Sequence, residues 1–207
     1  MRFRLLGPLE VENDGRTLDI SRPKQRALLA MLLLNANRVV STDALIDALW
    51  EDWIPETAAK ALQVYVSQLR RFVGASRLET KAPGYMLRVL EGEYDVVEFE
   101  ALVRRAQAES PAQAAATWRR ARSLWRGEPL ADFAASRFAQ ADIARLAELR
   151  LDAIEGSIEA ELDLGRHADV IGELESLVRG NPSRERFRYQ LMLALYRTGR
   201  QEDALEA

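Results

Sequence analysis

The side chains best suited to chemistry in this sequence are basic groups that gather between Thr57 and Arg88. Six lysines and arginines lie in this stretch against one acid, Glu79, so that positive charge exceeds negative charge by five. Residues 61–71, ALQVYVSQLRR, end in two of these arginines and also carry amide, hydroxyl and aromatic side chains. A local basic patch is what contact with phosphate groups requires, whatever the charge of the whole chain. This stretch is therefore the candidate binding surface.

The rest of the composition offers little to catalysis or to metal binding. The chain has no cysteine, which excludes disulfides, thiolate ligands and thiol catalysis, and its single histidine, His167, lies in a Gly-Arg-His turn without a partner pattern. Acids between residues 142 and 163 recur with arginines at helical spacing, as on a solvated helix face. We therefore expect a protein that is not an enzyme and that has no metal site and no cofactor.

The net charge of −3 averages two dissimilar halves. Residues 1–94 carry 13 basic and 12 acidic residues, a net charge of +1, whereas residues 95–207 carry 16 and 20, a net charge of −4. No run approaches the roughly 18 apolar residues of a membrane span, and the start MRFRLLGPLEV lacks a cleavable signal. We expect a cytoplasmic, two-domain protein that does not enter the membrane.

The elements that must position the basic patch follow one another in residues 1–94. FRLLGPLEV and RTLDI around the turn ENDGR predict a small antiparallel sheet. Ser21 as N-cap and Pro23 in the first turn predict a helix over KQRALLAMLLLNAN. We then expect a short strand RVVS, a helix DALIDALW capped by Ser41 or Thr42, a third helix from Thr57 to about Val73, and a hairpin in RLETKAPGYMLRVL.

The third helix divides into an apolar and a polar side. At about 100° per residue, its buried candidates fall within about 60° of one another: Leu62, Val66, Leu69 and Val73. The opposite side carries Lys60, Val64, Ser67, Gln68 and Arg71, with Gln63, Tyr65 and Arg70 on its shoulders. A solvated polar face and a DNA-binding face both fit this division. The hairpin that follows carries Lys81, and a second basic projection beside the helix favours DNA, in a major groove and the adjoining minor groove.

The ordered run LIDALW, TAAKALQVYVSQLRRFVGASRLETKAPGYMLRV resembles the winged-helix DNA-binding domain of OmpR-type transcription regulators. With SRPKQRALLAMLLLNAN it is closer still to the antibiotic-pathway activators known as the SARP family, over nearly all of residues 1–92. The resemblance implies base contacts by Gln63, Val64, Ser67 and Gln68, and phosphate contacts by Lys60, Tyr65, Arg70 and Arg71. It also implies a backbone contact by Trp50 and a wing that carries Thr80 and Lys81. OmpR-type proteins often have an arginine pair at Ser67 and Gln68, so their preferred DNA site does not transfer.

Residues 95–207 are predicted to be helical throughout. The expected helices cover 95–109, with Asp95 as cap, then 111–125, 137–164, 168–179 and 184–198. GRHADVIGEL at Gly165 and GRQEDALEA at Gly199 lie 34 residues apart, the period of tetratricopeptide (TPR) helix pairs. A generic helical bundle is the alternative. Because Gln201–Ala207 only begins a second pair, we expect a truncated helical domain.

From EYDVVEFEALV through LWRGEPL to the repeat, this half resembles the bacterial transcriptional activation domain of the SARP family. The expected fold is an α+β winged-helix domain, residues 1–94, followed by an all-α TPR-like domain, residues 95–207. The expected function is activation of transcription at direct repeats in promoters of secondary-metabolite (antibiotic) genes. Expected partners are double-stranded promoter DNA, RNA polymerase with its sigma factor, and further copies of the chain on DNA. The alternative function is an interaction scaffold whose winged helix binds protein.

Overall fold

The chain folds into two compact units that interleave along the sequence. The structure, a computed structural model, describes residues 1–206. One unit contains Met1–Glu98 together with Trp125–Ala147, and the other contains Phe99–Leu124 together with the residues from Glu148 onward. A segment of the helical half thus folds with the N-terminal unit. The domain boundary at residue 94 stays a prediction.

The first unit begins with the expected antiparallel sheet, in the order β1 (Arg2–Arg4), β2 (Glu10–Asn13) and β3 (Arg16–Thr17). Asp14 and Gly15 form the tight turn between β2 and β3, with φ values of 49° and 77°. A two-residue hairpin turn needs such values, which asparagine, aspartate and glycine adopt with little strain.

Three helices follow, α1 (Pro23–Leu34), α2 (Thr42–Trp50) and α3 (Ala58–Val73), with the short strand β4 (Val40–Ser41) before α2. The prediction that Ser21 caps α1 was wrong, because Arg22 is the N-cap residue and makes no side-chain capping bond. Ser41 does cap α2, since its hydroxyl accepts a hydrogen bond from the backbone amide of Ala44 at 3.2 Å.

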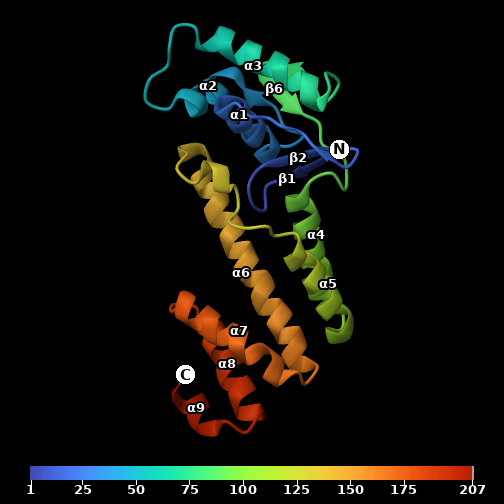
Figure 1. Cartoon of the computed structure of the whole chain (residues 1–207), viewed down its shortest axis with the longest axis vertical. Coiled ribbons are helices and arrows are strands. Elements are labelled where there is room, and N and C mark those ends of the chain that lie inside the picture. Colours follow the sequence, from blue (N-terminus) through green and yellow to red (C-terminus); the bar gives the residue numbers. More distant parts are fainter. Residues whose placement is uncertain (207) are drawn as a thin grey trace. The chain divides into compact units, whose positions relative to one another are not determined.

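The apolar side of α3 is buried as its periodicity predicts. Its four expected core residues are all at most 2% exposed: Leu62, Val66, Leu69 and Val73. α3 packs against α1 and α2, and the cap residue Gly74 ends it with a φ of 94° (Figure 1). Burial of one side leaves the other side of α3 free to face outward.

The predicted hairpin is present as β5 (Leu78–Lys81) and β6 (Gly84–Leu87) in a sheet of order β4-β6-β5. Tyr85 lies opposite Val40 on one side and Thr80 on the other. Gly84 is required here, because a Cβ atom at this position would overlap the carbonyl oxygen of Val40. The absence of a side chain lets β6 approach β4 closely.

The helices of the second half follow the predicted order. They are α4 (Asp95–Ala108), α5 (Pro111–Ser123), α6 (Gln140–Asp163), α7 (His167–Gly180), α8 (Glu185–Arg197) and α9 (Gln201–Glu206). The expected long helix from residue 137 begins instead with a separate 3-10 turn, η2 (Arg137–Ala139), preceded by η1 (Ala131–Phe133).

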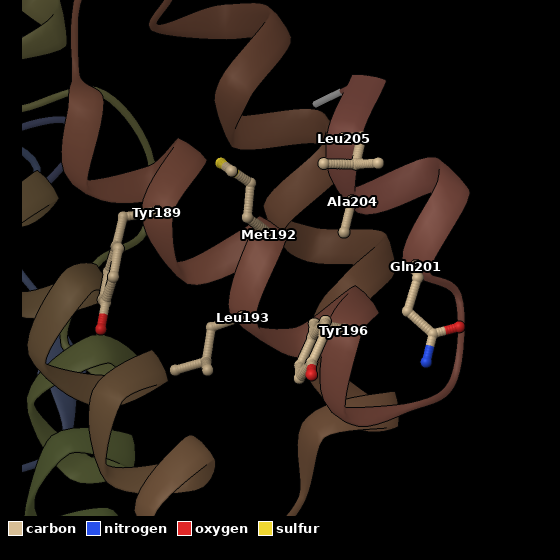
Figure 2. A pocket seen from close by; sticks show the side chains of 7 residues that line it. All are labelled: Tyr189, Met192, Leu193, Tyr196, Gln201, Ala204 and Leu205. Carbon is tan, nitrogen blue, oxygen red and sulfur yellow. The ribbon is translucent and has the colours of Figure 1, made fainter.

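The 34-residue repeat corresponds to two turns of the same geometry. Gly165 and Gly199 have φ values of 76° and 84° before α7 and α9. The amide of Arg166 donates to the carbonyl of Glu161 at 3.0 Å, and the amide of Arg200 donates to the carbonyl of Leu195 at 2.9 Å. Both bonds span five residues, as in a glycine-ended helix terminus. The TPR-like prediction is confirmed over α7 and α8, which pack against each other, and α8 also packs against α9 (Figure 1). Side chains of α8 and α9 line an apolar hollow of about 370 Å³ on the surface (Figure 2).

Candidate nucleic-acid interface

The outward side of α3 carries a continuous stripe of exposed residues. The exposed stripe consists of Lys60, Gln63, Val64, Ser67 and Arg71. None of their side chains makes a hydrogen bond or ion pair with any other residue in 1–206. At about 1.5 Å per residue the stripe is about 16 Å long, with a cation at each end. It is therefore free to contact another molecule along its whole length.

Arg70 connects α3 to the wing, the hairpin of β5 and β6. Its Nε donates to the carbonyl of Leu78 at 2.8 Å, and its terminal nitrogen donates to the hydroxyl of Thr80 at 2.8 Å. Arg70 as a whole residue is half-buried. Arg70 and Thr80 thus orient the wing relative to α3.

Glu79 on the wing faces two cations. Its carboxylate lies 3.3 Å from Lys81 and 2.8 Å from Arg88. Burial alone would raise the pKa of Glu79, but the hydrogen bonds and charges of Lys81 and Arg88 lower it below its ordinary value. The side chains of Lys81 and Arg88 are 47% and 55% exposed, so both remain accessible.

Arg77 has a partner that removes it from the candidate surface. Its two terminal nitrogens pair with both carboxylate oxygens of Glu93 at 2.5 and 2.8 Å. Burial opposes ionisation of Glu93, but the hydrogen bonds of Arg77 and Leu90 lower its pKa below the ordinary value. This bidentate pair holds the end of the wing, and the local excess of charge in the sequence overstates the cations available for binding.

The side chain of Gln68 is held by two residues at the start of α1. Its side-chain oxygen accepts from the guanidinium of Arg22 at 3.2 Å and also from the amide of Gln25, which is buried. Because a guanidinium only donates, the atom of Gln68 that faces Arg22 must be the oxygen. The amide nitrogen of Gln68 is left to contact a ligand. The sequence offered no sign of this pairing across 46 residues.

Trp50 and Tyr65 form a half-buried aromatic pair beside the stripe. Their ring centroids are 6.3 Å apart with an interplanar angle of 19°. The ammonium of Lys24 lies 4.8 Å from the centroid of the Trp50 ring and donates to the carbonyl of Leu49 at 2.6 Å. Trp50 thus closes α2 against α1 and α3, and Tyr65 on α3 stacks on it.

The winged-helix sheet is held by residues that lie far along the chain. The carboxylate of Asp95 accepts from the backbone amides of Leu5 and Leu6 at 2.9 and 3.0 Å, so it supports the sheet in addition to beginning α4. Burial raises the pKa of Asp95 above its ordinary value, although these two bonds oppose the rise. Asp132 pairs with Arg26 of α1 at 2.5 Å.

The loop between α2 and α3 is also held by a residue that lies far along the chain, Arg137. The backbone amide of Arg137 donates to the carboxylate of Glu51 at 3.0 Å, and its guanidinium pairs with Asp52. Beyond these acids the loop exposes two apolar side chains, Trp53 at 75% and Ile54 at 47%. Sequence reasoning missed this contact, because nothing local marks Arg137 as a partner of a loop 85 residues away.

Among residues 1–206 there is no cluster of three or more histidine, cysteine or acidic side chains that would hold a metal ion. His167 is the first residue of α7 and is half-buried, where the sequence predicted a surface turn. No helix formed by these residues has the length and apolar character that crossing a bilayer demands.

Two family models match the chain in the order of its elements. The model described as "Transcriptional regulatory protein, C terminal" matches residues 15–87, and the model described as "Bacterial transcriptional activator domain" matches residues 94–207. The fold and the exposed stripe thus define a winged-helix transcription regulator with a TPR-like helical region. The chain belongs to the SARP family of transcriptional regulators, as its sequence predicted.

Several curated proteins are similar to this chain in sequence. The chain is 41% identical to the regulatory protein AfsR of Streptomyces coelicolor, over 99% of this chain and 21% of AfsR. It is 40% identical to the transcriptional regulatory protein EmbR of Mycobacterium tuberculosis, over 99% of this chain and 55% of EmbR. It is 37% identical to the regulatory protein DnrI of Streptomyces peucetius, over 100% of this chain and 82% of DnrI. The chain therefore spans about a fifth of AfsR and about half of EmbR.

A solved structure has the same fold. The chain superposes on Mycobacterium tuberculosis EmbR in complex with a low affinity phosphopeptide with a TM-score of 0.93 and 40% sequence identity. The match covers 99% of this chain and 57% of that one.

Proposed function

We propose that this chain is a sequence-specific DNA-binding activator of transcription that places α3 in a major groove and the wing over the adjoining minor groove. The observation that carries this proposal is the exposed stripe, which has free amide and hydroxyl groups between two cations in a family of transcription regulators. An α-helix fits the major groove of B-DNA, and a cation at each end of the stripe matches the phosphates on either side of that groove.

The contacts divide into those that position the protein and those that select a sequence. Lys60 and Arg71 neutralise phosphates, and Lys81 of the wing contributes a third cation. Gln63 and Ser67 bond base edges, and Val64, which is 46% exposed, packs against a thymine methyl group.

Four of the residues predicted to contact DNA have more limited roles in this proposal. Gln68 acts only as a donor, through its amide nitrogen, because Arg22 and Gln25 occupy its oxygen. Arg70 and Thr80 position the wing. Trp50 supports Tyr65, whose hydroxyl is the group of this pair that bonds a phosphate.

Activation requires protein contacts in addition to DNA. Trp53 and Ile54, exposed on the loop between α2 and α3, support a contact with RNA polymerase or its sigma factor. A single winged helix covers too few base pairs to specify one promoter, so copies of the chain bind side by side on direct repeats. By family resemblance, these sites lie in promoters of secondary-metabolite genes.

Selection of bound fragments from a random duplex library, followed by titration of the selected duplex in increasing salt, tests the central proposal. We expect enrichment of one sequence and a steep loss of affinity with salt, since each neutralised phosphate adds about 0.9 to the slope. Gln63→Ala and Ser67→Ala should change the selected sequence. Gln107→Ala, which alters an exposed amide on α4, should not. A library without enrichment and a flat salt response would favour the scaffold alternative.

Assembly on direct repeats needs its own measurement. The whole chain should bind a duplex with two sites cooperatively when their spacing is near one helical turn. Insertion of about five base pairs, half a turn, should remove the cooperativity because it rotates the second copy to the opposite side of the DNA. Equal cooperativity at both spacings would contradict side-by-side assembly.

A further inference from the structure

The two polar atoms of the Gln68 side chain have different surroundings. Its oxygen accepts one hydrogen bond from the guanidinium of Arg22 at 3.2 Å and another from the amide of Gln25. Because an amide oxygen has two lone pairs, these two donors occupy its accepting capacity. Its amide nitrogen carries two N–H groups, and neither has an acceptor among residues 1–206. Gln68 can therefore donate to a ligand but has no lone pair left to accept.

Gln25 holds this orientation from inside the protein. It lies in the first turn of α1 and is only 4% exposed. Rotation of the Gln68 amide by half a turn would bring its NH2 group against the guanidinium of Arg22, which has no lone pair to offer. The rotated state would thus lose the bond from Arg22 and would force the amide of Gln25 to turn as well. Both partners at the start of α1 favour the state in which the nitrogen of Gln68 is free.

The orientation of Gln68 decides which base edge it can bond. A glutamine with both polar atoms free pairs with adenine, because its nitrogen donates to N7 and its oxygen accepts from the N6 amino group. Gln68 cannot make the second of these bonds, since its oxygen is occupied. The major-groove edge of guanine presents two neighbouring acceptors, N7 and O6. A group with two N–H donors and no free lone pair matches guanine, and it leaves the amino group of adenine or cytosine unpaired.

We propose that Gln25 and Arg22 are positioning residues that make Gln68 select guanine. This role rests on the proposed function, since Gln68 meets a base edge only when α3 occupies a major groove. Neither positioning residue bonds the base itself, because both act by holding the oxygen of Gln68. The base preference of α3 is thus set in part by a buried residue of α1 that lies 43 residues earlier in the sequence.

Selection of bound fragments from a random duplex library identifies the base pair that Gln68 faces. The unaltered chain gives a preferred site, and Gln68→Ala should lose discrimination at one position of that site, where we expect guanine. Affinities for duplexes that differ only at this base pair then measure the preference. The unaltered chain should bind guanine about tenfold more tightly than adenine, since a matched pair of bonds to a base edge discriminates by about this factor or more.

A modified base tests the acceptors directly. 7-Deazaguanine lacks the N7 acceptor and keeps the pairing of guanine with cytosine. Its use at this position should weaken binding of the unaltered chain and should leave binding of Gln68→Ala unchanged.

Gln25→Met tests the positioning. Methionine has a similar length but donates no hydrogen bond, so one lone pair of the Gln68 oxygen becomes free to accept from adenine. The preference for guanine over adenine should therefore fall from about tenfold to about threefold or less. Gln25→Met/Gln68→Lys should restore a guanine preference, because a lysine ammonium only donates and needs no positioning. Arg22→Ala, at an exposed residue, should lower the preference in the same direction as Gln25→Met.

Gln190→Met is the matched control. Gln190 is also a buried glutamine, and its amide donates to the backbone carbonyl of Glu155 at 3.0 Å and to the carboxylate of Glu159 at 2.8 Å. Its replacement should lower the melting temperature but leave the guanine preference unchanged, which separates a loss of stability from a loss of positioning. A thermal scan checks that each variant is folded at the temperature of the binding measurement.

Three results would overturn the role of Gln25 and Arg22 while leaving the proposed function intact, because the chain would still select a sequence. The first is a selected site in which no position depends on Gln68. The second is a base other than guanine at the position that does. The third is a full guanine preference in Arg22→Ala and in folded Gln25→Met. The absence of any enriched sequence with the unaltered chain would instead overturn the proposed function and this role together.

Discussion

Arg70 and Arg71 are adjacent in the sequence, but we expect Arg70 to stabilise the fold and Arg71 to contact DNA. Replacement of each arginine by methionine tests these two roles separately. Methionine keeps much of the apolar stem and removes the charge and the donors. Arg70→Met removes two bonds of 2.8 Å, to the carbonyl of Leu78 and to the hydroxyl of Thr80. A hydrogen bond from a charged donor contributes about 1.5–3 kcal/mol, and half-burial reduces that value through solvent screening. We expect a loss of about 1–2 kcal/mol in the free energy of unfolding, by the same principle.

Arg71→Met should act on DNA binding instead. Its side chain is exposed and has no partner in residues 1–206, so the free energy of unfolding should change by less than about 0.5 kcal/mol. Loss of one phosphate contact should lower the slope of log affinity against log salt by about 0.9. When salt is raised from about 50 to 200 mM, the affinity of Arg71→Met for DNA should therefore fall by a factor about 3.5-fold smaller than the affinity of the unaltered chain does.

Two measurements on the same variants decide the matter. Urea unfolding followed by circular dichroism gives stability, and anisotropy of a labelled duplex at several salt concentrations gives the slope. Arg70→Met should shift the unfolding midpoint and keep the salt slope, and Arg71→Met should do the reverse. The reasoning would be refuted if Arg70→Met reduced the salt slope as much as Arg71→Met without loss of stability.

Three other changes have defined outcomes. Gly84→Ala should separate β6 from β4 and lower the melting temperature, because the new Cβ overlaps the carbonyl oxygen of Val40; an unchanged melting temperature in a thermal scan would contradict this. Glu79→Gln should raise both affinity for DNA and the salt slope, because it frees Lys81 from its carboxylate partner, and the titration used for the arginines measures both. Asp95 has a raised pKa, so between its ordinary and raised values the folded chain binds more protons than the unfolded chain, and its contribution to stability falls as pH rises through that window. Urea unfolding of the unaltered chain and Asp95→Asn from about pH 4 to 7 should show that the variant lacks this fall.

Local patterns in the sequence were sufficient for the elements and for their family. The apolar period of residues 62–73 predicted which side of α3 is buried, and Gly165 and Gly199 predicted the repeat, because both features depend on residues within a few turns of one another. The order of sheet, three helices, hairpin and helical repeats followed from such signals. The DNA contacts of individual side chains stay predictions.

Only the tertiary structure decided which polar side chains are free. Arg70 and Arg71 are the same residue type side by side, yet the hairpin folds against the first and leaves the second exposed. The oxygen of Gln68 is occupied from a helix more than 40 residues away in sequence. Asp95 accepts a hydrogen bond from Leu5, which lies 90 residues earlier beside the first sheet. Contacts of this kind form when burial of the apolar faces brings distant segments together. They cannot be predicted from the spacing of residues within one segment, because that spacing does not specify which segments pack against each other.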